Sequence, residues 1–201
     1  MRKLIVKTAV ITFAAVIAFC AVLYGCLAAF TPKTLADGWA SAGNYGIAVK
    51  YYEKQYQKTE SENDLAALCV KVDEVNDAKR AEKYLAAFTA SDGFETYCLN
   101  EGENLGYAIS AREFYFGKYA VAAYYADGID AAITVAKKAV FSAYTENNAF
   151  YIMLIEIKTL SHEDGVKISA AINTIKSELT DPKEIDSADR DIAYAESINN
   201  A

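Results

Sequence analysis

One long apolar stretch, Thr8–Phe30, constrains this chain more than any other feature of its sequence. The stretch contains no Asp, Glu, Lys, Arg or His, and it lies between Lys7 on one side and Lys33 on the other. A helix of this length, at about 1.5 Å per residue, measures roughly 34 Å, and the hydrocarbon core of a bilayer is about 30 Å thick. The sequence therefore predicts one transmembrane helix over residues 8–30, preceded by a basic segment, 1–7.

The same stretch is compatible with three fates at the membrane. A cleaved secretory signal usually has a shorter apolar region and small residues before its cleavage site, whereas the best site here follows Ala28, with Cys26 two residues before it. A lipid-anchored protein would carry a small residue before the modified cysteine, as Gly25 does here, but Tyr24 departs from that pattern. An uncleaved signal anchor requires neither a cleavage site nor a lipid-anchor pattern, and we predict that residues 8–30 are such an anchor. Cleavage, or lipidation at Cys26, stays open.

The charges beside the span predict its orientation. Arg2, Lys3 and Lys7 all precede it, and basic residues are retained preferentially on the cytoplasmic side. We therefore expect a single-pass cell membrane protein with a cytoplasmic N-terminus and with residues 31–201 outside the cytoplasm. The sequence has no N-x-Ser/Thr acceptor site, which favours a bacterial cell envelope protein over a eukaryotic secretory one. The reversed topology stays an alternative.

The part of the chain after the span is acidic. Three of the 20 Lys and Arg residues precede the span, so 17 basic residues follow it against 27 acidic ones, a net charge of −10. Such a domain repels phosphate groups, which argues against nucleic-acid binding and against lying flat on an anionic membrane surface. Attachment to the membrane is therefore expected through residues 8–30 alone, with no nucleic acid among the partners.

The rest of the chain alternates short helical segments with turn signals. Thr31-Pro32 and Asn44 are typical helix starts, and Gly43 is a typical helix end. One helix is expected from Pro32 to about Gly43, and a second over about Tyr45–Lys58. Further helices are expected after the turns at Ser61–Asp64, Asn76-Asp77, Ser161–Gly165 and Asp181–Glu184.

Two pairs of these segments resemble the tetratricopeptide repeat, a family of helical hairpins. In the first pair, the family's leucine, aromatic, glycine, aromatic, alanine and aromatic positions are held by Leu35, Trp39, Gly43, Tyr45, Ala48 and Tyr52. In the second pair, the matching register is held by Leu68, Cys69, Val72, Asn76, Ala81, Leu85 and Phe88. Ala48 and Ala81 are 33 residues apart, one fewer than the family's period. Glu60 and Gln55 depart from the pattern, which has a proline and a small residue there.

Two later segments, Phe116–Tyr144 and Tyr151–Pro182, match the same repeat more loosely. In the last of them Ala170 stands at the position where a small residue lets the paired helices approach. Residues 94–112 fit no register, and we expect an irregular hairpin there.

The resemblance implies an all-α fold after the transmembrane helix: an α-solenoid of helix hairpins over residues 31–180, closed by a capping helix over 181–201. Tetratricopeptide domains bind protein segments in a concave groove lined by the first helix of each hairpin. Carried over to this sequence, that groove would draw on four residues: Asp37, Ser41, Lys71 and Tyr115.

Tyrosine is the one residue type in excess, with 15 Tyr against 9 Phe. Several of them crowd together at Tyr115, Tyr119, Tyr124 and Tyr125. Tyrosine offers a large amphipathic contact area at low entropic cost, so exposed copies are candidate partner contacts. The alternative is that these side chains seal contacts between helices, and both interpretations stay open for this group.

Cys69 and Cys98 are the two cysteines outside the apolar stretch. They belong to no C-x-x-C pair, and the only histidine, His162, is distant in sequence, so a zinc site is not expected. Cysteines on helices are usually buried small hydrophobes, although export would allow a disulfide between these two.

Nothing in the sequence assembles into a catalytic constellation. His162 lies in the polar turn Ser161–Gly165, which is typical of a helix N-terminus with acids in its first turn. No Gly-rich phosphate loop and no singled-out pair of carboxylates occurs, so neither an enzyme nor a cofactor is predicted.

These observations lead to two hypotheses about function. The first is a membrane-anchored, tetratricopeptide-like scaffold or adaptor that binds a protein or peptide at the outer face of the cytoplasmic membrane. The second is a secreted or lipid-anchored protein that binds a small ligand, which would require Cys26 or the residue after Ala28 to become the new N-terminus.

Overall fold

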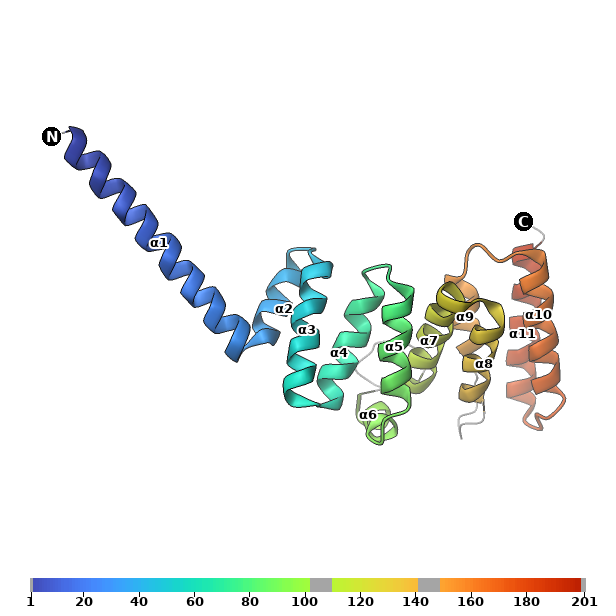
Figure 1. Ribbon diagram of the computed structural model, residues 1–201. Helices are drawn as coiled ribbons and strands as arrows, with labels where there is room; N and C mark the ends of the chain where they lie inside the picture. Colours follow the sequence, from blue (N-terminus) through green and yellow to red (C-terminus); the bar gives the residue numbers. More distant parts are fainter. Residues whose placement is uncertain (1, 102–109, 141–148, 200–201) are drawn as a thin grey trace. The chain divides into compact units, whose positions relative to one another are not determined.

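The computed structural model describes residues 2–101, 110–140 and 149–199, and every regular element in these ranges is an α-helix (Figure 1). The helices are α1 Arg2–Phe30, α2 Pro32–Ser41, α3 Tyr45–Thr59, α4 Glu62–Asp73, α5 Ala78–Thr89, α6 Phe94–Glu101, α7 Ala111–Asp127, α8 Ile129–Val140, α9 Ala149–Glu156, α10 His162–Lys176 and α11 Pro182–Asn199. The predicted all-α class is therefore confirmed. Within the predicted irregular segment 94–112, positions 102–109 lie outside the described residues, as does Tyr144 of the third hairpin.

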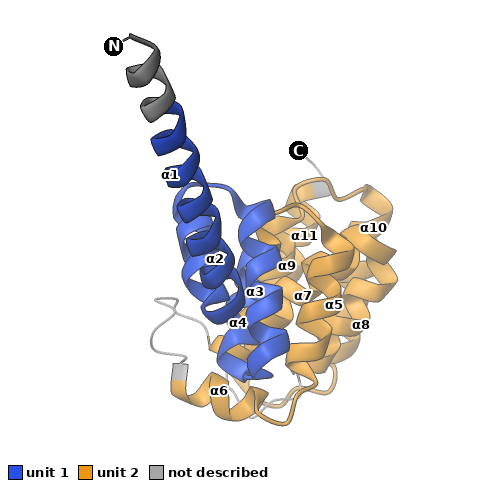
Figure 2. Cartoon of the chain, turned by 60° about the vertical axis from the view of Figure 1, so that its left-hand side comes forward, with its two compact units in different colours: residues 1–71 blue, residues 72–201 orange. Residues whose placement is uncertain are grey.

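The chain divides into two units, residues 1–71 and 72–201, and the division falls inside α4 (Figure 2). Unit 1 holds α1, α2, α3 and most of α4. Unit 2 holds the end of α4 and all later helices. Each unit is described by itself below.

Helix α1 is apolar and long enough to cross a membrane, as the sequence predicted. Its segment Val10–Phe30 has 21 residues and a mean hydropathy of 2.5, and the structure buries none of it. The helix ends where Thr31 donates its backbone N–H to the Leu27 carbonyl at 2.9 Å. Pro32 is the first residue of α2, where a helix needs no N–H donor, so the missing N–H of proline costs nothing. Because proline would disrupt the interior of a helix, Pro32 also prevents α1 and α2 from forming one continuous helix.

The core of unit 1 lies between α2 and α3. Ala36 on α2 and Ala48 on α3 are completely buried, because small side chains let the two helices approach closely. The turn between these helices uses Gly43 at φ +74°, which only glycine adopts without strain. Thr31 and Asn44 precede the two helices as predicted, but the side chain of neither accepts a capping hydrogen bond.

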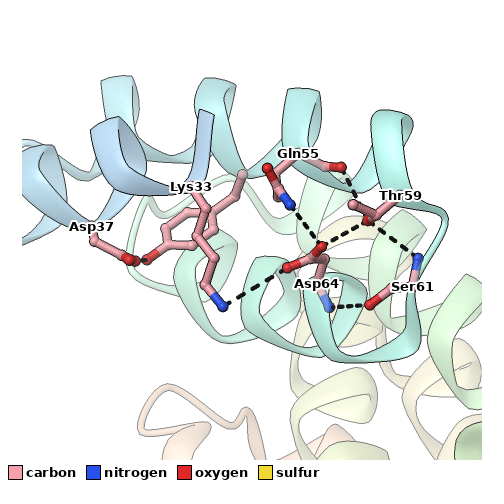
Figure 3. A network of polar contacts seen from close by, with 7 residues as sticks. Lys33, Asp37, Gln55, Thr59, Ser61 and Asp64 are labelled. Carbon is pink, nitrogen blue, oxygen red and sulfur yellow. Dashed lines mark hydrogen bonds and ion pairs between the residues drawn. The ribbon is translucent and has the colours of Figure 1, made fainter. Parts of the chain in front are cut away.

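A buried carboxylate joins three helices of unit 1 (Figure 3). Asp64 on α4 is 8% exposed, and its Oδ2 accepts hydrogen bonds from Gln55 Nε2 at 3.0 Å and from Thr59 Oγ1 at 2.7 Å. Lys33 Nζ of α2 lies 3.9 Å from Asp64 Oδ1. Ser61 Oγ accepts from the Asp64 backbone N–H at 3.3 Å, which is half of the predicted capping box. The network thus satisfies a buried charge, and its role is structural.

Helix α7 is central to unit 2, because it packs against α5, α6, α8 and α9, while α10 pairs with α11. Gly117 of α7 faces Ile152 of α9 at close range. A Cβ atom added to Gly117 would lie 2.6 Å from Ile152 Cβ, well inside van der Waals contact. Only glycine fits there without displacing α9.

A cluster of aromatic rings packs between α5, α6 and α7 in unit 2. Tyr115 of α7 is 1% exposed and meets Phe88 of α5 edge to face, with ring centroids 4.9 Å apart. Phe94 and Tyr97 of α6 complete the cluster. Tyr115 is therefore a core residue here, which is the packing alternative that the sequence left open, and its side chain has no surface for a partner.

Cys69 and Cys98 are buried free thiols, as expected of cysteines on helices, and the alternative of a disulfide between them is not formed. Burial raises the pKa of the Cys98 thiol to about 12. One expectation needs correction. Ala170, expected at a close helix contact, is exposed, and the neighbouring Ala171 is buried instead. The repeat register assigned to that helix is thus one residue out of phase with its buried face.

The first prediction concerns Gly117. Replacing it with Ala should lower the free energy of unfolding by about 1–3 kcal/mol, because the added methyl group overpacks the α7–α9 contact. Gly38→Ala is the matched control: a Cβ there meets no atom within 4 Å, so the variant should gain up to about 1 kcal/mol from helix propensity. Urea unfolding of the full chain in detergent micelles measures both. An unchanged midpoint for Gly117→Ala would contradict the packing described here.

The second prediction concerns Asp191, a carboxyl on α11 that is 3% exposed. Burial raises its pKa from 3.8 to about 7, against a weaker opposing effect of Arg190. Between pH 4 and 7 the folded chain thus holds a proton that the unfolded chain has lost, so the stability that Asp191 contributes is complete below pH 4 and is lost as the pH rises through 7. Asp191→Asn should therefore gain about 2–4 kcal/mol at pH 8 and little at pH 4. Urea unfolding of both proteins at pH 4 and pH 8 measures this. A stability difference between Asp191→Asn and the unchanged chain that is the same at the two pH values would contradict the prediction.

Candidate functional site

Unit 2 contains a pocket of about 500 Å³, a size typical of ligand sites. It lies at the turn between α4 and α5, against one face of α5 and α7 and beside the end of α9. The residues that line it are Asp73, Asn76, Asp77, Ala78, Ala81, Val121, Ala122, Tyr125 and Glu156.

Local backbone geometry places the acids at one side of the rim. Helix α4 ends at Asp73, and Asn76 then takes a left-handed conformation at φ 57°, which asparagine tolerates better than most residues. This turn brings Asp77 to the N-cap of α5, where its Oδ1 accepts the Arg80 backbone N–H at 3.2 Å. The predicted helix start at Asp77 is therefore confirmed, and the cap fixes this carboxylate at the pocket.

Lys118 of α7 holds two of the rim acids. Its Nζ lies 3.0 Å from Asp73 Oδ2, 2.7 Å from Glu156 Oε1 and 2.9 Å from Glu156 Oε2. Burial by itself lowers the pKa of Lys118, but the bond to Glu156 and the charge of Asp73 outweigh it, so the pKa lies above its usual value. Lys118 therefore stays charged and neutralises one of three carboxylates, which leaves the rim negative.

The lining of the pocket also has apolar residues and one aromatic residue. The apolar ones are Ala78, Ala81, Val121 and Ala122, and the aromatic one is Tyr125. Tyr125 is 53% exposed, and its ring meets that of Tyr124 edge to face, with centroids 5.3 Å apart. Apolar lining residues, an exposed aromatic ring and carboxylates at the rim suit a cationic group on an aliphatic stem, such as a Lys or Arg side chain.

The predicted tyrosines of α7 occupy three different environments. Tyr125 lines the pocket. Tyr124 is half-buried and donates its hydroxyl to Asp164 Oδ2 at 3.0 Å; burial, this bond and the carboxylate charge raise its pKa to about 12. Tyr119 is also half-buried, and burial followed by the nearby charge of Glu82 raises its pKa. Of the four tyrosines proposed from the sequence, only Tyr125 lines the pocket.

The other three predicted site residues belong to unit 1 and do not line the pocket. Asp37 accepts a hydrogen bond from the Tyr52 hydroxyl at 2.5 Å. Ser41 is exposed at the last position of α2. Lys71 Nζ lies 5.7 Å from the centroid of the Tyr45 ring. Asp37 and Lys71 thus already have structural contacts.

Sequence reasoning missed Asp73, Lys118 and Glu156. A signal was nevertheless present for the two acids. Asp73 is the last residue of α4 and Glu156 the last residue of α9, where a negative charge opposes the helix dipole. In the structure both acids pair with Lys118 and line the pocket.

The polar turn at His162 contributes no chemistry to this pocket. Ser161 Oγ accepts the Asp164 backbone N–H at 3.1 Å, and His162 is exposed as the first residue of α10. The predicted capping role of this turn is confirmed. Within the described ranges, no three His, Cys, Asp or Glu side chains are grouped closely enough to hold a metal ion.

Comparison with known proteins returned no match: no protein-family model, no curated protein and no solved structure is similar to this chain.

Proposed function

We propose that this chain is a membrane-anchored scaffold or adaptor, not an enzyme, and that it binds a basic segment of a protein or peptide in the pocket of unit 2. The observation that carries the proposal is the combination in one hollow of a negative rim, Asp73, Asp77 and Glu156, with the exposed ring of Tyr125. Two helix pairs joined by short turns, α2 with α3 and α7 with α8, support a tetratricopeptide-like arrangement.

The proposed location follows from the apolar helix and its flanking charges. Helix α1 anchors the chain in the cytoplasmic membrane, with its basic N-terminus in the cytoplasm and the later helices at the outer face of that membrane. The acidic balance after the span, −10, attracts a basic partner toward the pocket and repels nucleic acid. Association should therefore weaken as the salt concentration rises.

The test places a photo-crosslinking amino acid at position 125 of the full-length chain in the cell. We expect a protein adduct whose crosslinked peptide contains Lys or Arg. A synthetic peptide of that sequence should then bind the chain in nanodiscs, and Asp77→Asn with Glu156→Gln should weaken binding about three- to tenfold by removing two rim charges. Asparagine preserves the cap of α5. Asp186→Asn with Glu178→Gln, two exposed acids away from the pocket, is the control and should have no effect.

The second candidate function is a small-ligand site, which the pocket volume of about 500 Å³ favours. The crosslinking experiment distinguishes it from the first. Native mass spectrometry of the purified chain would then reveal a bound small molecule that the Asp77→Asn, Glu156→Gln variant loses, with no protein adduct at position 125. An adduct that forms equally well in the rim variant would exclude both assignments of the pocket.

A further inference from the structure

Lys118 pairs with two of the three rim acids of the unit 2 pocket in the way that a ligand cation would. Its Nζ lies 3.0 Å from Asp73 Oδ2, and 2.7 Å and 2.9 Å from the two carboxylate oxygens of Glu156. An ammonium group has three N–H donors, and three carboxylate oxygens lie within their reach here. The side chain is 20% exposed, so these contacts are mostly shielded from water. The chain thus carries its own cation at this part of the rim.

Lys118 also allows the two acids to lie close together. Asp73 ends α4, Glu156 ends α9, and Lys118 belongs to α7, so one side chain joins three helices at the pocket. Two carboxylates that approach the same nitrogen atom would repel each other without a cation between them. With Lys118 in place, the three side chains together carry one net negative charge, and both acids already have a charged partner.

Asp77 differs from the other two rim acids. It is exposed, and its Oδ1 accepts the Arg80 backbone N–H at 3.2 Å. An amide N–H carries no net charge, so this contact orients the Asp77 carboxylate without neutralising it. The exposed ring of Tyr125 lines the same pocket. Asp77 and Tyr125 thus offer a ligand cation a full negative charge and an aromatic ring.

From this difference we infer that the pocket selects a ligand with one cationic group, which pairs with Asp77. Lys118 excludes a second cationic group from Asp73 and Glu156, and it thereby determines specificity. A second cation would have to approach another ammonium group, and the acids that it needs are already hydrogen-bonded. The expected partner segment has an isolated Lys or Arg among uncharged residues, not a run of basic residues. This inference rests on the proposed function, because it concerns the same pocket.

The test compares two small amines that imitate a lysine side chain: cadaverine, a diamine, and pentylamine, the monoamine of the same chain length. Ligand-observed NMR measures their dissociation constants for the full chain in phosphatidylcholine nanodiscs, with empty nanodiscs as the blank. Selectivity is the dissociation constant of cadaverine divided by that of pentylamine. Lys118→Met removes the internal cation and should lower this ratio about three- to tenfold, because the second ammonium of cadaverine then pairs with Asp73 and Glu156.

Four further variants assign the effect. Lys118→Arg keeps the positive charge and should keep the selectivity of the unchanged chain. Lys118→Gln keeps an amide donor for the two acids, should shift the ratio in the same direction as Lys118→Met, and replaces it if far-UV circular dichroism shows that the methionine variant does not fold. Lys183→Met removes an exposed lysine that does not line the pocket and should leave the ratio unchanged. Asp77→Asn should weaken the binding of both amines.

The outcomes separate this inference from the proposed function. If both amines bind, Asp77→Asn weakens them, and the ratio is the same with and without Lys118, the pocket recognises cations but Lys118 does not limit their number. That result overturns the inference alone. If neither amine binds the unchanged chain, the pocket does not recognise a cationic group on an aliphatic stem, and the inference and the proposed function both fail.

Discussion

The exposed apolar surface of α1 is the constraint on which the rest of the structure depends. Its side chains from Val10 to Phe30 are not covered by the protein, and leaving that much hydrocarbon in water is strongly unfavourable. Unit 1 is built onto the end of this helix: Pro32 interrupts it, Lys58 caps it and Tyr51 bonds to it. Any environment that accepts α1 therefore also determines where α2 and α3 lie.

Opposite charges are separated along the chain. Helix α3 of unit 1 carries three exposed lysines, Lys50, Lys54 and Lys58, and the negative rim is at the pocket of unit 2. A single net charge conceals both features, because the acids that follow the span outnumber the lysines of one helix. In the proposed account the acidic pocket serves recognition of a basic partner.

The sequence predicted the helices well because their ends are determined locally. Pro32, Gly43, Asp77 and Ser161 each act on the backbone within a few residues, and the structure has helix boundaries at these positions. The pocket was not predictable in the same way. Its charged residues come from α4, α7 and α9, and no local pattern indicates that Lys118 reaches two distant acids. Burial of Tyr115 and exposure of Tyr125 likewise depend on which helices pack on α7, not on the spacing along it.

The central claim is that α1 is retained in the mature chain and spans the membrane. The most direct test is the intact mass of the chain extracted from membranes that have been washed in alkaline carbonate. The account predicts that the protein stays in the washed membranes and that its mass includes residues 1–30. A soluble species that begins after Ala28, or a lipid-modified species that begins at Cys26, would contradict it.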